Sequence, residues 1–351
     1  MYHKQIRYLF WINRLYNNGC EELFFHIDCL SFNNILQGNL TNSFMEVNMT
    51  KRLRAITCLT LLVLMTMVLT SCVNDTTYPG DMNIIEASEV LNHQGQAHVI
   101  VVDVRGQEAY DKGHLEGAIL LSPSSLVVEA PVPQTLVAKE TLEACLGDAG
   151  ISNEDTLYLY DDNNGVSAAR VWWSLKVYGH NNVFIVNGGA SALVKAGATL
   201  TLSPTTLEKA TYTAAEADQS MIASYEDVKA VSESEASDVV LLDVRSTAEF
   251  AAGYIPGAIN YAHTRNLYSD GTFLSSRDIG LFYHDLGLVP EDDIIVYCKS
   301  SFRAAQTVAL LQEAGYTHLR IYDGAWIEWE QKEGPAVPVE ETAPITEQEG
   351  S

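Results

Sequence analysis

The sequence "VIVVDVRGQEAYDKGHLEGAI" spans residues 99–119, and "VVLLDVRSTAEFAAGYIPGAI" spans residues 239–259. The two stretches align without a gap. In each, an apolar run ends in Asp-Val-Arg, and a Gly-Ala pair follows further along. The matching positions are Asp103 and Asp243, Arg105 and Arg245, Gly113 and Gly253, and Gly117 and Gly257. A match of this length indicates a duplicated domain rather than the short units of a solenoid.

A second pair of matching stretches follows in the same order. Residues 156–189 ("TLYLYDDNNGVSAARVWWSLKVYGHNNVFIVNGG") align with residues 294–325 ("IIVYCKSSFRAAQTVALLQEAGYTHLRIYDGA"). Each begins with an apolar run, continues as a helical pattern up to Gly179 or Gly315, and ends in another apolar run. Short, nearly all-apolar strands that alternate with helices are typical of a parallel sheet covered on both faces. The sequence therefore predicts an α/β fold with two tandem domains, each a mainly parallel sheet flanked by helices.

Length and charge narrow the possible functions. The chain has 351 residues, enough for about two ordinary domains. Its net charge of −24 argues against nucleic acid as a partner, because phosphate binding requires Lys and Arg. Its nine histidines show no spacing typical of metal ligands. We therefore expect neither a metal nor a cofactor.

The stretch "MTKRLRAITCLTLLVLMTMVLTSC" (49–72) has the form of a secretory signal. It has a basic start, an apolar run from Ala55 to Leu69 and small residues at its end. The apolar run is shorter than the roughly 20 residues of a membrane-spanning helix. A signal belongs at a chain start, so the simplest account is that translation begins at Met49. We expect residues 1–48 to be untranslated or unstructured and residues 49–71 to be removed.

The end of this segment, Leu69-Thr70-Ser71-Cys72, resembles the lipobox of bacterial lipoproteins. That resemblance implies cleavage before Cys72 and acylation of its thiol. The protein would then be anchored by lipid to a membrane of the cell envelope, facing the periplasm or the extracellular side. A plain signal peptide and an uncleaved anchor are the alternatives.

Only Cys145 and Cys298 fall inside the predicted domains, and Cys298 is the candidate nucleophile. It ends an apolar run in "VYCKSSFRAAQT" (296–307), and a short polar loop leads into a helical pattern. A reactive cysteine needs a pKa below its usual value of about 8.5. Inward-pointing loop amides, the helix N-terminus, Lys299 and Arg303 would each stabilise the thiolate. The alternative is a buried apolar cysteine, which the polar flanking residues disfavour.

These motifs together resemble the tandem rhodanese-like sulfurtransferases, the family of thiosulfate and 3-mercaptopyruvate sulfurtransferases. The similarity comes from Asp-Val-Arg followed by Gly-x-Ile-Pro-Gly-Ala (253–258), the Cys298 loop, and "YDGAWIEW" (322–329). It implies a two-domain α/β fold and transfer of sulfane sulfur through a persulfide on Cys298. The predicted segments are a first rhodanese-like domain (82–199), a linker (200–220), a second domain (221–335) and a disordered acidic tail (336–351).

The resemblance also implies which domain and which residues act. Asp161 stands in the first domain where Cys298 stands in the second, so only the second domain is expected to be catalytic. The expected partners are a small anionic donor, thiosulfate or 3-mercaptopyruvate, and a thiol or cyanide acceptor, besides the membrane that holds the lipid. The expected substrate-binding residues are Arg245, Lys299, Ser300, Ser301, Phe302 and Arg303. For Arg245, a structural ion pair with Asp243 is the alternative.

Three other functions remain open. The protein could be an envelope sulfur carrier loaded by a partner, or a regulatory rhodanese domain without turnover. Cysteine-dependent phosphatases have a similar loop but place five residues between Cys and Arg, whereas four residues lie between Cys298 and Arg303. The loop also departs from the two-domain family because Ser301 replaces the usual glycine. A positive φ at Ser301 would cost about 1 kcal/mol.

Overall fold

The computed structural model describes residues 78–234 and 237–333. The predicted leader, the predicted lipidation site Cys72 and the whole predicted tail (336–351) lie outside the described residues. Within the described ranges, no helix is both long enough and apolar enough to cross a bilayer.

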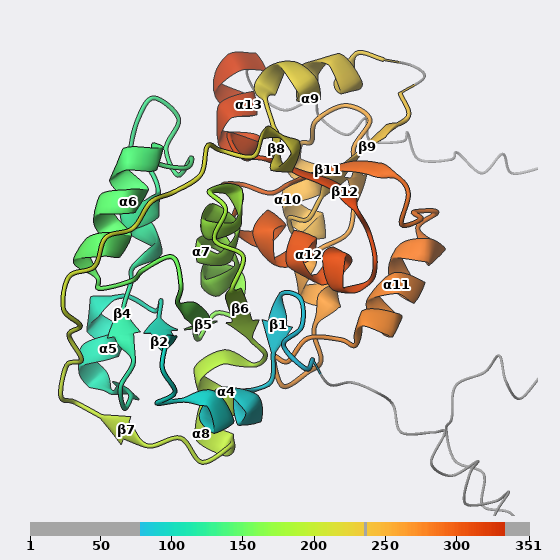
Figure 1. Ribbon diagram of the computed structural model, residues 1–351. Coiled ribbons are helices and arrows are strands. Elements are labelled where there is room, and N and C mark those ends of the chain that lie inside the picture. Colours follow the sequence, from blue (N-terminus) through green and yellow to red (C-terminus); the bar gives the residue numbers. More distant parts are fainter. Residues whose placement is uncertain (1–77, 235–236, 334–351) are drawn as a thin grey trace, which may run out of the picture. The chain divides into compact units, whose positions relative to one another are not determined.

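The first domain contains a five-stranded parallel sheet with the strand order β1-β6-β5-β2-β4 (Figure 1). Its strands are β1 (Ile84–Ile85), β2 (Val99–Asp103), β4 (Ile119–Leu120), β5 (Thr156–Tyr160) and β6 (Val183–Val186), and β3 (His114–Leu115) pairs separately with β7 (Leu200–Thr201). Its helices are α4 (Ala87–His93), α5 (Gln107–Lys112), the 3-10 turn η1 (Pro123–Leu126), α6 (Lys139–Asp148), α7 (Val166–Val177) and α8 (Gly189–Lys195).

The second domain repeats this sheet with the strand order β10-β9-β11-β12-β8, again all parallel. Its strands are β8 (Ile222–Ala223), β9 (Val239–Asp243), β10 (Ile259–Asn260), β11 (Asp293–Tyr297) and β12 (His318–Tyr322). Its helices are η2 (Gln219–Met221), α9 (Tyr225–Ser232), α10 (Thr247–Ala252), η3 (His263–Asn266), α11 (Ser276–Asp285), α12 (Phe302–Glu313) and α13 (Ala325–Glu333). The predicted α/β fold with two parallel sheets flanked by helices is confirmed.

The connection after β7 has no regular secondary structure until η2. It runs along the first domain past α6 (Figure 1), and backbone bonds attach it there, from Ala210 to Gly147 (3.0 Å) and from Ala215 to Tyr178 (2.9 Å). The side chain of Tyr212 is buried in this stretch. The connection is therefore part of the packed surface of the first domain.

The two domains meet through α7 and α12, which pack against each other at the centre of the molecule (Figure 1). Both helices are largely buried, which explains their apolar sequences. The fifth residue of each helix reaches the loop before the other helix. Arg170 of α7 donates to Ser301 Oγ at 2.6 Å, and Gln306 of α12 donates to the Asn164 carbonyl at 2.5 Å. The duplicated domains thus exchange equivalent contacts.

A second pair of exchanged contacts involves the residue that follows the third long strand of each domain. Asp323, after β12, accepts a hydrogen bond from the Leu136 amide at 2.7 Å. Asn187, after β6, accepts one from the Phe273 amide at 2.8 Å. Asp323 also forms a 2.7 Å ion pair with Arg170, whose side chain is 0% exposed. The interface is therefore polar where the loops meet and apolar between the helices.

Replacing Arg170 by Met should destabilise the protein by about 3–5 kcal/mol, because it leaves the Asp323 carboxylate buried without its partner. Chemical unfolding measures this change. Lys209→Met is the matched control, since the Lys209–Asp148 pair is exposed and should contribute less than about 1 kcal/mol. Equal effects of the two substitutions would show that the buried ion pair does not stabilise the domain interface.

Candidate active site

Cys298 directly follows β11, at the carboxyl edge of the second sheet. Parallel sheets bind their ligands at this edge, because the loops after the strands converge there. The Cys298 carbonyl accepts a hydrogen bond from the Trp326 amide (3.0 Å), and the Lys299 carbonyl accepts one from the Ile327 amide (3.2 Å). These bonds join the loop to the start of α13. The Cys298 side chain is a free thiol and is only 1% exposed.

Ser301 has a left-handed backbone conformation, with φ 64°, at the N-cap of α12. Glycine suits this region better than serine, so the loop shape costs about 1 kcal/mol. The side chain is fully buried, and its hydroxyl accepts from Arg170 and lies 3.0 Å from Asp323 Oδ1. The hydroxyl is thus occupied at the domain interface, and the first domain holds the strained residue in place.

Arg170 and Asp323 are site residues that the sequence reasoning missed. The guanidinium of Arg170 contacts Ser301, Asp323 and the Gln134 carbonyl (3.1 Å), and lies over the rings of Trp173 and Phe302. The available signal was a charged residue inside the apolar run "ARVWW". Its partners Ser301 and Asp323 are more than a hundred residues away, so the run itself does not identify them.

The equivalent loop of the first domain is filled by the carboxylate of Asp161. Its Oδ1 accepts from the amides of Asn163 (3.2 Å) and Gly165 (2.8 Å), and its Oδ2 accepts from those of Ser167 (2.8 Å) and Ala168 (3.1 Å). Burial raises the pKa of Asp161, and the four amide donors oppose that rise. This loop and the start of its helix therefore form a cradle for an anionic group.

In the second domain, the equivalent loop and helix start contain two backbone amides without a hydrogen-bond acceptor among the described residues. Arg303 and Ala304 are the second and third residues of α12, as Ser167 and Ala168 are of α7. In the described part of the chain, the amides of Arg303 and Ala304 have no hydrogen-bond acceptor. They are unpaired donors at a helix N-terminus, where the helix dipole favours negative charge.

A cavity of about 300 Å³ lies beside the Cys298 loop. The residues that line it include Arg245, Glu249, Gly253, Lys299, Trp326 and Glu330. It therefore combines the predicted Arg245 and Lys299 with acidic and aromatic groups that were not predicted as site residues.

Arg245 reaches this cavity but is already paired. It forms a buried ion pair with Asp243 (2.6 Å), donates to the Gly253 carbonyl (2.7 Å) and lies 4.3 Å from the centre of the Trp326 ring. Arg105 of the first domain makes the same bonds to Asp103 and Gly113. The bonds that the two repeats share have a structural role, and Trp326 is specific to the second site.

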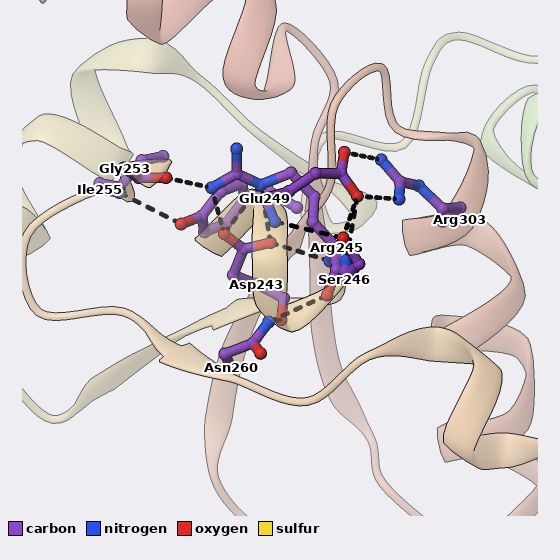
Figure 2. A network of polar contacts seen from close by, with 9 residues as sticks. Asp243, Arg245, Ser246, Glu249, Gly253, Ile255, Asn260 and Arg303 are labelled. Atoms are coloured by element: carbon purple, nitrogen blue, oxygen red, sulfur yellow. Dashed lines mark hydrogen bonds and ion pairs between the residues drawn. The ribbon is translucent and has the colours of Figure 1, made fainter. Parts of the chain in front are cut away.

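Arg303 is paired with Glu249 of α10, a residue that the sequence reasoning also missed. Its Nη1 and Nη2 donate to the two carboxylate oxygens at 2.8 and 2.9 Å, and Figure 2 shows Glu249 held between Ser246 and Arg303. The bonds from Arg303, and then those from Ser246, lower the pKa of Glu249 to about 2. Contact with Glu249, and proximity to the Cys298 sulfur, raise the pKa of Arg303. The sequence shows Ser-x-x-Glu (246–249), which is typical of a helix-capping box. It does not show that Arg303 pairs with this glutamate.

The remaining predicted residues differ in their surroundings. Lys299 is exposed and has no carboxylate partner among the described residues. Phe302 lies under the Arg170 guanidinium, and the Ser300 carbonyl accepts from Ser301 Oγ (2.6 Å).

Cys145 lies half-buried on α6, where burial raises the pKa of its thiol. No group of three or more His, Cys, Asp or Glu in residues 78–234 and 237–333 is arranged to hold a metal ion.

Comparison with known proteins identifies the fold family. The Rhodanese-like domain model matches residues 86–196 and 224–332. The thiosulfate sulfurtransferase of Pseudomonas aeruginosa is 30% identical over 275 residues, 73% of this chain and 96% of the relative. The crystal structure of the 3-mercaptopyruvate sulfotransferase SseA from Escherichia coli matches with a TM-score of 0.64 and 25% identity, over 70% of this chain and 99% of SseA.

A third similarity concerns the fold alone. The anaerobic ergothioneine biosynthesis enzyme from Chlorobium limicola matches with a TM-score of 0.64 at 22% identity, over 73% of this chain and 70% of that enzyme. The two domain matches each cover one of the two sheets described above, and the chain matches SseA and the Pseudomonas aeruginosa enzyme over nearly their whole length. The chain belongs to the rhodanese family and carries two Rhodanese-like domains in tandem.

Proposed function

We propose that this protein is a sulfurtransferase that carries sulfane sulfur as a persulfide on Cys298. The thiolate attacks the outer sulfur of thiosulfate, the sulfur–sulfur bond of the donor breaks, and sulfite leaves with the bonding electrons. With 3-mercaptopyruvate, the carbon–sulfur bond breaks instead, and the carbon takes up a proton to give pyruvate. A thiol or cyanide then takes the outer sulfur and regenerates the thiolate, which is covalent catalysis with ping-pong kinetics.

The observation that carries this proposal is the way the first domain holds Asp161. Each carboxylate oxygen of an aspartate is two bonds from Cβ, and so is the outer sulfur of a cysteine persulfide. The amides of Ser167 and Ala168 bind Asp161 Oδ2, and the amides of Arg303 and Ala304 have the same places in α12. An outer sulfur on Cys298 would therefore meet two unpaired donors. This fit supports a persulfide anion as the bound state.

Charge near the loop supports the same chemistry. The N-terminus of α12 stabilises an anion at the loop, and the exposed Lys299 ammonium is available to the donor oxygens. Because the thiol is only 1% exposed, a side chain must move aside when a donor arrives. Arg303 is the candidate, since it lies by the Cys298 sulfur and its partner Glu249 lines the cavity.

The relatives support the reaction class and two donors. One is named for thiosulfate and one for 3-mercaptopyruvate, and both match this chain over nearly their whole length. Both donors are small anions with a transferable sulfur, which a cavity containing Lys299 suits. The protein is an enzyme of the sulfurtransferase class, and the choice of donor depends on the charges in the cavity.

Cys298→Ser should reduce turnover of thiosulfate with cyanide to the background rate, because the oxygen of serine does not carry a transferable sulfur. Cys145→Ser is the matched control and should retain normal turnover, since Cys145 lies on α6. A steady-state assay of thiocyanate formation measures both. Normal turnover by Cys298→Ser would overturn the mechanism. A wild-type protein that accepts one sulfur without repeated turnover would be a sulfur carrier instead.

Asp161→Ala should destabilise the protein by about 2 kcal/mol or more, because the substitution leaves four amides of the first cradle without their acceptor. It should leave most of the turnover intact, since the first domain has no nucleophile in this position. Asp162→Ala is the control, because Asp162 is exposed and should change neither property. Loss of turnover by Asp161→Ala in a protein that remains folded would assign the first loop a catalytic role.

A further inference from the structure

We infer that Glu249 is a specificity-determining residue, which occupies the Arg303 guanidinium and so disfavours donors with two negative charges. This inference rests on the proposed sulfurtransferase function and deepens it. It assigns the site to singly charged sulfur donors in preference to dianions such as thiosulfate.

The pairing geometry occupies the Arg303 guanidinium. Both of its terminal nitrogens donate to Glu249, at 2.8 and 2.9 Å, which is the bidentate arrangement that a donor's oxygens would otherwise form (Figure 2). Glu249 is held from the other side by Ser246, whose amide (3.0 Å) and hydroxyl (2.8 Å) both donate to Oε2. The carboxylate is thus fixed in place.

The charges around the cavity nearly cancel. Arg245 is neutralised by Asp243, and Arg303 by Glu249. The remaining groups on the wall are Lys299 from the loop and Glu330 from α13, one of each sign. A dianion entering this cavity meets one ammonium and one carboxylate that have no partner among the described residues, besides the two ion pairs. Lys299 is the one cation on the described wall without a carboxylate partner, so a second negative charge on the donor has no unpaired cation to contact.

Comparing two donors that differ in charge but react in the same way distinguishes the charge effect from the sulfur chemistry. Thiosulfate and methanethiosulfonate have similar size and the same transferable sulfur, but a methyl group replaces one charged oxygen in the second. Attack by the thiolate on either donor breaks its sulfur–sulfur bond and forms the enzyme persulfide. Sulfite leaves from the first and methanesulfinate from the second, each with the bonding electrons. No oxidant or reductant is needed.

Glu249→Gln removes the charge and is expected to preserve the helix. Glu249 is the third residue of α10 and completes its capping box with Ser246, and glutamine is also found in that position. Glu330→Gln is the matched control. It removes one negative charge from the same cavity wall but leaves Arg303 paired with Glu249.

The test measures kcat/KM of the full-length chain for both donors with cyanide as the acceptor. Glu249→Gln should raise kcat/KM for thiosulfate about tenfold, because the freed guanidinium gains a charge-assisted contact to the donor's oxygens. The rise for methanethiosulfonate should be about threefold or less. Glu330→Gln should raise both values by similar small factors. Equal factors for both donors in Glu249→Gln, or loss of both activities in a folded variant, would overturn the inference.

A second measurement uses the wild-type protein and does not depend on any variant folding. Sulfate and methanesulfonate are unreactive anions with two charges and one charge, and each competes with the donor. Methanesulfonate should inhibit at least as strongly as sulfate, and clearly stronger inhibition by sulfate would contradict the inference. If neither donor places sulfur on Cys298, the proposed function fails. If both donors react but the charge preference is absent, only the role of Glu249 fails.

Discussion

The buried ion pair between Arg170 and Asp323 is the interaction on which the active loop depends. It joins a helix of the first domain to the end of a strand in the second, and the same guanidinium supports the hydroxyl of Ser301. Ser301 has a backbone conformation that serine seldom adopts, so the loop needs this outside support. The first domain therefore contributes to the site although it has no nucleophile in the equivalent position.

The duplicated domains show how one cradle can hold two different groups. In the first copy, the Asp161 carboxylate satisfies the loop amides, and that loop is complete in itself. In the second copy, a thiol one atom shorter leaves the amides of Arg303 and Ala304 unpaired. A single added sulfur atom would restore the missing acceptor. The loop with Asp161 is thus structural, whereas the loop with Cys298 in the same position is suited to carry sulfur.

The fold could be predicted from the sequence because its signals are local and occur twice. Apolar strands, helical spacing and the repeated Asp-Val-Arg stretch indicate two parallel sheets without knowledge of any distant contact. The order and position of Cys298, Lys299 and Arg303 were visible in the same way. The pairings of Arg170 with Asp323 and of Arg303 with Glu249 were not visible, because they join segments that only the folded sheets and helices bring together. The sequence therefore indicated which charges are present near Cys298, and Asp243 as an alternative partner of Arg245, but not that Glu249 neutralises Arg303.

Mass spectrometry of the chain after treatment with thiosulfate tests the central claim most directly. The peptide that contains Cys298 should gain the mass of one sulfur atom, and addition of cyanide should remove that mass as thiocyanate forms. The peptide that contains Cys145 should remain unchanged and serves as the internal control. Added sulfur on Cys145 in place of Cys298, or no added sulfur in a protein that turns over thiosulfate, would contradict a persulfide on Cys298.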